Sequence, residues 1–249
     1  MKYYGITDKG LVRKNNQDSF TVIECRPKNC LIFALCDGMG GAKSGEIASE
    51  ISKRAFSEYV FAKLTSRIVK HPDYGDVLNR ACQEANGVAY EYSLFDEEFF
   101  GMGTTIVGGI AESSGRVSLV SVGDSRAYLV SPKKNKITQI TKDHSIVQEL
   151  VDSGVITRAA ARTHSQKNII TRALGTEDTV EPDFFHLSLK PGESLLLCSD
   201  GLTNYVEEED ILKSFIISDN PEELCKSLLR KTYKNGAGDN VTVIVLVNR

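Results

Sequence analysis

The chain has 249 residues, of which 41% are hydrophobic, and its 30 basic and 33 acidic residues leave a net charge of −3. This length and apolar content suit one compact core, so we expect a single domain over residues 1–249. The mixed charges form no basic stripe, which argues against nucleic acid or an anionic membrane surface as a partner. No apolar run approaches about 18 residues, and no signal-peptide core follows the N-terminus. We therefore expect a cytoplasmic protein without membrane insertion.

The cysteines predict neither disulfides nor a zinc site. They form no C-x-x-C pair, and none begins a C-x₅-R phosphatase loop. We expect buried free thiols in a reducing compartment. The cysteines are Cys25, Cys30, Cys36, Cys82, Cys198 and Cys225.

The first elements along the chain are a buried strand and two helices. Leu31–Cys36 is a short apolar run. Apolar residues then recur at helical spacing from Ser44 to about Val69, and again from Asp76 to about Leu94. The sequence KHPDYG breaks the pattern between them, which predicts a helical hairpin.

Three closely spaced strands follow, at Thr104–Ile110, Val117–Val122 and Arg126–Val130. They leave no room for crossover helices, so they must pair antiparallel. The next segment, His144 to Gly175, is polar and mixes short helical turns with the sequence THSQKN. We expect it to form a flap near a functional site.

The C-terminal part predicts strands at Ser194–Ser199 and Val241–Val247, with two helices between them. The helices are expected near Glu207–Phe215 and Pro221–Tyr233, the second beginning after an Asn220 cap. Strands and helices are thus segregated along the chain. This order favours an α+β fold over a doubly wound α/β fold.

The sequence CDGMGGAKSG, which follows the first strand, has the outline of a phosphate-binding loop. A Walker loop requires G-x-x-x-x-G-K-[ST], but Asp37 and Ala42 stand at the two glycine positions. The dinucleotide pattern G-x-G-x-x-G fails because Lys43 stands at its third glycine. These substitutions argue against a nucleotide-binding switch or kinase.

Aspartates flank the apolar runs repeatedly. Asp37, Asp124 and Asp200 each follow a strand, Asp239 precedes one, and Asp18 precedes a further apolar run. A single aspartate in this position is usually a turn residue. Several in one core would repel one another and raise their pKa values unless a cation lay between them. Ligation by oxygen alone favours Mg²⁺ or Mn²⁺ over zinc, and the four histidines show no ligand spacing.

Eight motifs then give a family resemblance: VRKNNQD, CDGMGG, GMGTT, VGDSRAYL, KDHS, QKNIITRALG, SDGL and GDNVTVIV. In this order they resemble the metal-dependent protein phosphatases of the type 2C, or PPM, family, most closely its bacterial serine/threonine branch. The resemblance extends from about Thr7 to Val247. It implies a four-layer α-β-β-α sandwich, in which helical pairs flank two antiparallel sheets, with a flap over about residues 144–175.

The resemblance also implies the metal ligands. Asp37 would bridge two Mn²⁺ or Mg²⁺ ions, and Asp200 and Asp239 would complete the shell of the first ion. The Gly38 carbonyl would bind the second ion, and Asp124 together with Asp200 matches a third, weaker site. Asp37 is thereby expected to be catalytic as well.

Two further roles and two departures come from the same comparison. Asp18 would orient metal-bound waters, and Arg13 stands at the phosphate-binding arginine of the family. Gln17 replaces a common glutamate, so it adds no charge to the second metal. Met39 replaces a histidine proposed as general acid, which leaves a metal-bound water or a flap histidine, His144 or His164, as the proton source.

The implied activity is hydrolysis of phosphoserine and phosphothreonine on proteins by a hydroxide that two metal ions activate, without a phosphoenzyme. Members of this branch often oppose Hanks-type kinases, so phosphorylated proteins, such a kinase included, are the expected partners. The alternative is a non-catalytic relative that binds phosphoproteins or another partner. The presence of Asp37, Asp200 and Asp239 argues against that alternative.

Overall fold

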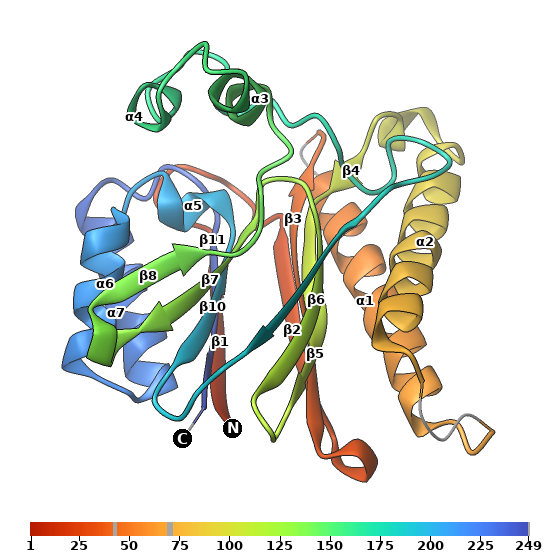
Figure 1. Cartoon of the computed structure of the whole chain (residues 1–249). Coiled ribbons are helices and arrows are strands. Elements are labelled where there is room, and N and C mark those ends of the chain that lie inside the picture. Colours follow the sequence, from red (N-terminus) through yellow and green to blue (C-terminus); the bar gives the residue numbers. More distant parts are fainter. Residues whose placement is uncertain (42–43, 69–71, 249) are drawn as a thin grey trace.

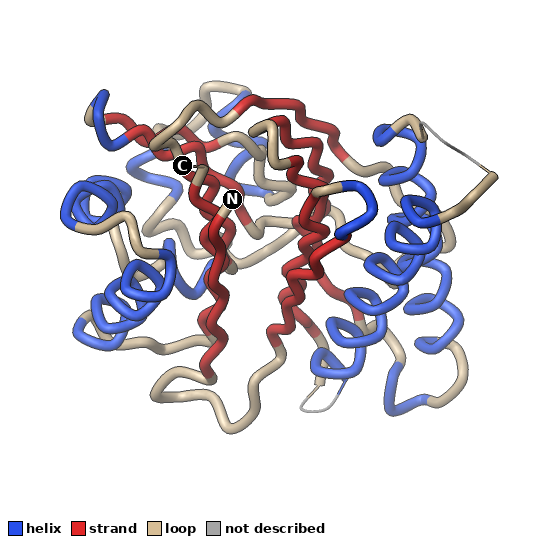
Figure 2. The backbone as a smooth tube through the Cα atoms, turned by 90° about the horizontal axis from the view of Figure 1, so that it is seen from below, coloured by secondary structure: helices blue, strands red, loops and turns tan. Residues whose placement is uncertain are grey.

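Two antiparallel sheets lie face to face at the centre of the structure, and helices cover both outer faces (Figure 1). The structure is a computed structural model that describes residues 1–41, 44–68 and 72–248. Seen from below in Figure 2, the strands form two layers between two groups of helices. The predicted α+β, four-layer sandwich is therefore confirmed.

The first sheet has the strand order β1-β11-β10-β7-β8. Helices α6 (Glu208–Ile217) and α7 (Pro221–Lys234) pack on its outer face through a cluster of buried apolar side chains. The predicted cap is confirmed, because Asn220 Oδ1 accepts the backbone N–H groups of Glu222 and Glu223. The strands are β1 (Lys2–Asp8), β7 (Arg126–Ser131), β8 (Lys136–Gln139), β10 (Ser194–Cys198) and β11 (Val241–Val247).

The second sheet has the order β2-β3-β5-β6-β9, with β4 as an additional partner of β3. Helices α1 (Ser44–Thr65) and α2 (Tyr74–Ser93) form the predicted hairpin on its outer face. The predicted end of the first helix, Val69, lies outside the described residues. The strands are β2 (Asp18–Cys25), β3 (Cys30–Met39), β4 (Gly103–Thr104), β5 (Ile106–Glu112), β6 (Arg116–Val122) and β9 (Asp183–Ser188).

Alternation along β3 shows how the layers hold together. Leu31, Phe33 and Leu35 point between the two sheets, whereas Ile32 and Ala34 point into the core beneath α1 and α2. Successive side chains of a strand leave opposite faces, so a strand buried on both sides needs apolar residues throughout. Each fully buried side chain of this size contributes about 1.5–3 kcal/mol.

The six predicted strands are the six inner strands of the two sheets, and the four edge strands β1, β2, β8 and β9 were missed. The residues of β9 alternate between half-buried and exposed, so they give no continuous apolar run. The predicted strand Thr104–Ile110 is divided into β4 and β5 at Thr105, whose side-chain hydroxyl accepts the Asp37 N–H group.

Residues 144–175 form a separate projection at one end of the sandwich (Figure 1). Its helices are α3 (Ile146–Asp152) and α4 (Arg158–Ala161), which agree with the predicted short helical turns. Isolated bridges join Ser145 to Ile170 and Thr104 to Leu174. The projection, called the flap below, is thus tied to the body beside the end of β3.

All six cysteines are buried and free of disulfides, as predicted. Among the described residues, no helix has the length and apolarity needed to cross a bilayer.

Candidate metal and phosphate site

Two predicted site residues face each other across neighbouring strands. Asp18 of β2 and Asp37 of β3 are direct partners in the antiparallel register. Side chains at such positions leave the same face, with their Cβ atoms about 4.5–5.5 Å apart, and two like charges there are destabilising. The fold therefore places two carboxylates in contact at the end of one sheet.

The backbone of Asp37 is fixed by the threonines between β4 and β5. Thr105 N–H and Thr104 Oγ1 both donate to the Asp37 carbonyl at 2.9 Å. Asp37 N–H donates in turn to Thr105 Oγ1 at 3.0 Å. The hydroxyls of Thr105 and Ser125 are 2.7 Å apart, which connects Asp37 to the loop that carries Asp124.

The other sheet supplies Asp200 and Asp239. Asp200 begins α5 (Asp200–Thr203) directly after β10, and Asp239 precedes β11. Ser199 Oγ donates to Asp18 Oδ2 at 2.8 Å, so the end of β10 is joined to the start of β2. Carboxylates from both sheets thus meet at one end of the sandwich.

The electrostatics show that the charges of the other four carboxyl groups all act on Asp37. Burial raises the pKa of Asp37 well above its usual value, and the charges of Asp18, Asp200, Asp124 and Asp239 raise it further. Burial likewise raises the pKa of Asp18 to about 7. The pKa of Asp200 rises to about 6, through burial and then the charge of Asp239. Burial and the charge of Asp200 raise the pKa of Asp124 as well.

The chemistry of this cluster fits a hard divalent cation. All its donors are oxygen atoms, the ligands that Mg²⁺ and Mn²⁺ prefer. Asp18 Oδ1 is buried without a hydrogen-bond partner, which costs free energy unless a ligand or water satisfies it. The Gly38 position admits only glycine, because a Cβ there would overlap the carbonyl oxygen of Gly45.

The carboxylates are not gathered into a ready ligand set. Within the described part of the chain, no three Asp, Glu, His or Cys side chains stand close enough together to hold a metal ion. Asn204 Nδ2 holds Asp200 Oδ2 at 2.9 Å, and Arg13 holds Asp239. A cation would have to draw these side chains from their present partners, and the ligand roles remain predictions.

Arg13 lies in the site, but it contacts a predicted metal ligand. Its Nε and Nη2 atoms bond the two carboxylate oxygens of Asp239 at 2.8 and 2.9 Å. The Arg13 side chain is 52% exposed, so the fork stays accessible from solvent. The same planar fork suits two phosphate oxygens, which would compete with Asp239 for it.

Sequence reasoning assigned no role to Asn240, which organises the loops around the cluster. Asn240 Oδ1 accepts Gln17 N–H at 2.9 Å, and its Nδ2 donates to the carbonyls of Lys9 and Asn15. Gln17 Nε2 donates to the Gly41 carbonyl at 3.0 Å. The only sequence feature that could have indicated this role is the position of Asn240, a polar residue between Asp239 and an apolar strand.

The two flap histidines have other partners. His144 is buried, and its Nδ1 accepts Gly123 N–H at 3.0 Å, so in the neutral ring Nε2 carries the proton and faces Asp183. Burial and then the Arg172 charge lower the pKa of His144. His164 Nδ1 accepts the N–H of Gln166. None of these contacts reaches the carboxylate cluster.

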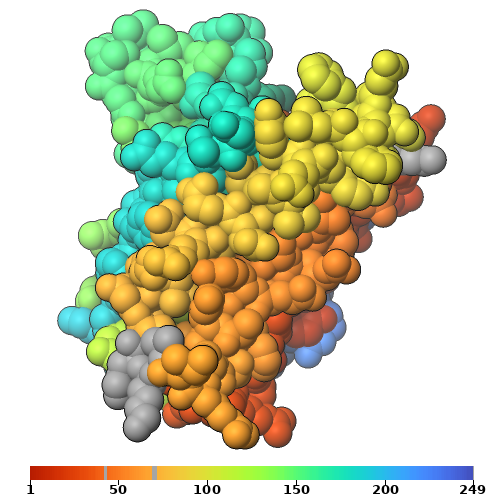
Figure 3. Space-filling view, turned by 90° about the vertical axis from the view of Figure 1, so that its right-hand side faces the viewer, coloured from red at the N-terminus to blue at the C-terminus, as the bar shows by residue number. Residues whose placement is uncertain are grey.

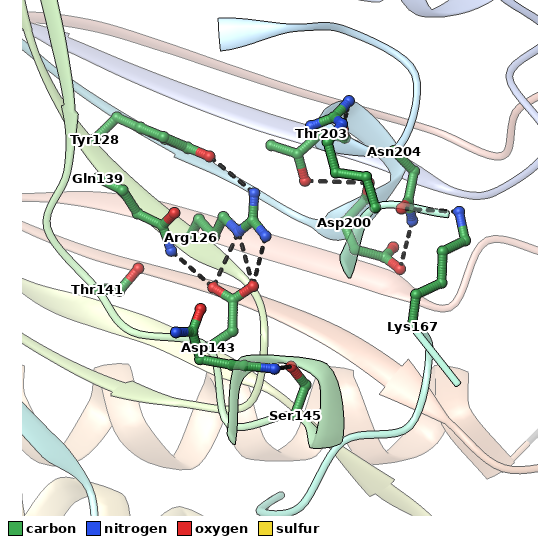
Figure 4. Close-up of polar contacts among 12 residues, drawn as sticks. Arg126, Tyr128, Gln139, Thr141, Asp143, Ser145, Lys167, Asp200, Thr203 and Asn204 are labelled. Atoms are coloured by element: carbon green, nitrogen blue, oxygen red, sulfur yellow. Dashed lines mark hydrogen bonds and ion pairs between the residues drawn. The ribbon is translucent and has the colours of Figure 1, made fainter. Parts of the chain in front are cut away.

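A cavity of about 300 Å³ lies between the flap and the body, and Asp124 and Asp200 form part of its lining. Lys167 of the flap donates to Asn204 Oδ1 at 3.3 Å, and Asn204 holds Asp200 (Figure 4). This chain of contacts connects the flap to a predicted metal ligand.

A partly buried ion pair also lines the cavity. Arg126 of β7 bonds both carboxylate oxygens of Asp143, at distances down to 2.6 Å, and Gln139 donates to the same carboxylate (Figure 4). Arg126 also donates to the Tyr128 hydroxyl at 3.1 Å. The Arg126 charge lowers the pKa of Asp124, against the larger effect of burial.

Comparison with known proteins places this chain and its fold in one family. A model of the protein phosphatase 2C family matches residues 12–218. The chain therefore belongs to the protein phosphatase 2C family, as the motifs predicted.

Individual relatives agree with that assignment. The chain is 38% identical to the serine/threonine phosphatase Stp of Listeria welshimeri, over 96% of this chain and 93% of the relative. The structure of serine/threonine phosphatase Stp1 from Staphylococcus aureus matches with a TM-score of 0.90 at 34% identity, covering 100% of this chain and 95% of the other. The catalytic domain of phosphatase PstP, solved with two manganese ions, matches with a TM-score of 0.82 at 35% identity, covering 98% and 96%.

Proposed function

We propose that this chain is a metal-dependent phosphatase that hydrolyses phosphoserine and phosphothreonine on proteins. The observation that carries the proposal is the convergence of five mutually repelling carboxyl groups from both sheets beside an accessible arginine fork. Membership in a family whose named relatives are serine/threonine phosphatases supports the same activity.

The protein supplies oxygen ligands for the metal ions. Asp37, Asp200, Asp239 and the Gly38 carbonyl would hold two Mn²⁺ or Mg²⁺ ions, and Asp124 with Asp200 would hold a weaker third. When bound, two such ions activate water and stabilise the charge that develops on the phosphoryl oxygens. The positive charge of the bound ions would also relieve the repulsion among these carboxylates.

The remaining residues position the substrate and the attacking water. Arg13 leaves Asp239 and grips two phosphoryl oxygens with its fork. Asp18 Oδ1, which has no partner at present, accepts a hydrogen bond from the attacking water. Met39 has no proton to give, and the contacts of His144 and His164 do not reach the carboxylate cluster, so the leaving alkoxide takes its proton from water.

The wider setting is part of the proposal. Residues 1–249 act as one catalytic domain, with residues 144–175 as its flap. The substrates are cytoplasmic phosphoproteins, and a Hanks-type serine/threonine kinase is among them.

The test is phosphate release from a phosphothreonine peptide by EDTA-treated protein before and after addition of Mn²⁺ or Mg²⁺. We expect activity only with metal, and almost none in Asp37→Asn. Asp210→Asn is the matched control, because Asp210 is an exposed aspartate of α6 that pairs with Lys213. Peptide binding without metal-dependent phosphate release would contradict the proposal and favour a non-catalytic relative.

A further inference from the structure

An exposed apolar surface follows helix α2, at the opposite side of the site from the flap helices. Leu94, Phe95 and Phe100 are 62%, 86% and 81% exposed. Tyr92 and Phe99 complete the surface, with ring centroids 5.0 Å apart. We call residues 92–100 the rim patch. In Figure 3 its yellow atoms project from the upper edge of the molecule.

The rim patch is anchored directly to the loop that leaves Asp37. Ser44 Oγ, at the start of α1, donates to the Glu98 carbonyl at 2.9 Å. Met102 N–H donates to the Phe99 carbonyl at 3.0 Å, and Gly103 then pairs with Met39. The patch therefore has a fixed position beside the end of β3, within reach of a polypeptide whose phosphorylated residue occupies the site.

Four acidic residues stand next to these apolar residues in the sequence. Glu91, Asp96, Glu97 and Glu98 are exposed. Within the part of the chain that the structure describes, no lysine or arginine forms an ion pair with any of these four. Other exposed acidic residues do have such partners; for example, Asp76 pairs with Arg80 and Glu222 pairs with Lys226. The patch thus combines exposed aromatic area with four acidic side chains for which the described residues provide no ion-pair partner.

Scattered exposed apolar residues are ordinary, whereas a contiguous aromatic surface marks an interaction site. An occupant of this patch must offer apolar side chains for the rings and positive charge for the carboxylates. A lysine or arginine would also gain from contact with an aromatic face. This complementarity selects one kind of occupant, a polypeptide segment in which a large apolar residue stands next to Lys or Arg.

We propose that the rim patch docks the part of a phosphoprotein substrate that flanks the phosphorylated residue, and that it selects apolar-basic flanks. The inference rests on the proposed function, because the phosphorylated residue itself is placed at the carboxylate cluster. The rim patch would then add substrate selectivity that a site binding only phosphate lacks.

The test compares two phosphoserine peptides of equal length, one with Leu, Arg and Lys beside the phosphoserine and one with Gly and Glu there. Binding is measured by fluorescence anisotropy on EDTA-treated protein, and kcat and KM are measured with Mn²⁺. In Phe95→Ser/Phe100→Ser we expect Kd and KM for the apolar-basic peptide to rise about 10-fold, with kcat unchanged. Hydrolysis of p-nitrophenyl phosphate, which is too small to reach the patch, should stay within about twofold of wild type.

Charge reversal gives an independent measurement. Glu97→Lys/Glu98→Lys should weaken binding of the apolar-basic peptide and strengthen binding of the acidic one. Both changes in affinity should become smaller as the salt concentration rises. Ile217→Ser is the matched apolar control, because Ile217 is 84% exposed on α6, which covers the other sheet. Glu58→Lys on α1 is the charge control. Neither control should alter the preference between peptides.

Several outcomes would overturn the docking proposal. One is an unchanged peptide preference in both patch variants. Another is an equal loss on both peptides and on p-nitrophenyl phosphate, which indicates a purely structural role. A third is a dimeric wild type with a monomeric Phe95→Ser/Phe100→Ser in sedimentation, because the patch would then join two copies of this chain. Failure of metal-dependent turnover would refute the proposed activity. The anisotropy measurement on metal-free protein tests peptide docking independently of that activity.

Discussion

Replacing Asp18 by asparagine should stabilise the metal-free protein. Asp18 is buried opposite Asp37, and its pKa rises from a usual value of 3.8 to about 7 in the folded chain. Between these two values the folded state holds a proton that the unfolded state has lost. Stability therefore falls as pH rises through this window, which is opposite to the behaviour of a salt-bridged carboxylate.

The magnitude follows from the size of the pKa shift. About three pKa units at 1.36 kcal/mol each give a penalty of about 4 kcal/mol at pH 8, and of about 2 kcal/mol at pH 5. The Asp18→Asn substitution would remove the charge while the new amide oxygen still accepts the Ser199 hydroxyl, so the variant should recover most of this penalty.

The assay is urea unfolding of wild type and Asp18→Asn in EDTA at pH 5 and pH 8. The free-energy advantage of the variant should be larger at pH 8, and it should shrink or reverse in saturating Mn²⁺, because a bound cation would offset the wild-type charge. A variant that is less stable than wild type in EDTA at pH 8 would refute the electrostatic reasoning.

Three further predictions concern the site and a distant carboxylate. Arg13→Ala should lower kcat/KM on a phosphopeptide about 10- to 150-fold without changing the Tm, and full activity in the folded variant would contradict a phosphate-binding role. In titration calorimetry, Asp37→Ala and Asp239→Ala should lose most of their affinity for Mn²⁺, whereas Asp124→Ala should still bind the two tighter ions. An unchanged Mn²⁺ affinity in Asp37→Ala would exclude the two-ion site. Burial raises the pKa of Glu193, but hydrogen bonds from Lys190 N–H, Lys134 and Ser131 lower it overall to about 2. The ionised Glu193 therefore stabilises the folded protein above pH 4.5, and this stabilisation is lost as pH falls toward 2. Glu193→Gln should thus destabilise the protein by about 1 kcal/mol in urea unfolding at pH 7, after allowance for solvent screening, with no difference near pH 2.

The sequence predicted the interior of the fold better than its margins. Inner strands such as β3 and β11 are buried on both faces, so their apolar residues form unbroken runs. Edge strands have fewer neighbours and keep polar or half-exposed residues, as in the sequence DFFHLS of β9. Their pairing depends on a neighbouring strand far away in the chain, and a local pattern carries little of that information.

In the site, likewise, the sequence predicted where the aspartates lie but not which residues they contact. The aspartates could be placed from sequence because each flanks a recognisable apolar run, and strand ends of packed sheets meet. The contacts of these aspartates could not be predicted from sequence. Arg13 and Asp239, for example, are 226 residues apart, and their pairing depends on how two loops fold. Asn240 was missed for the same reason, since its bonds to Lys9 and Asn15 span almost the whole chain.

The carboxylate cluster also explains why the surrounding frame is so strongly bonded. Repulsion among these five carboxyl groups pushes the ends of the two sheets apart, so other contacts must hold this end together. The Asp37 backbone bonds to Thr104 and Thr105, and the Ser199 bond to Asp18 joins the sheets. Apolar packing between the sheets then offsets the remaining repulsion. Because a bound cation would remove that repulsion only in the folded chain, metal affinity and folding stability should be thermodynamically linked.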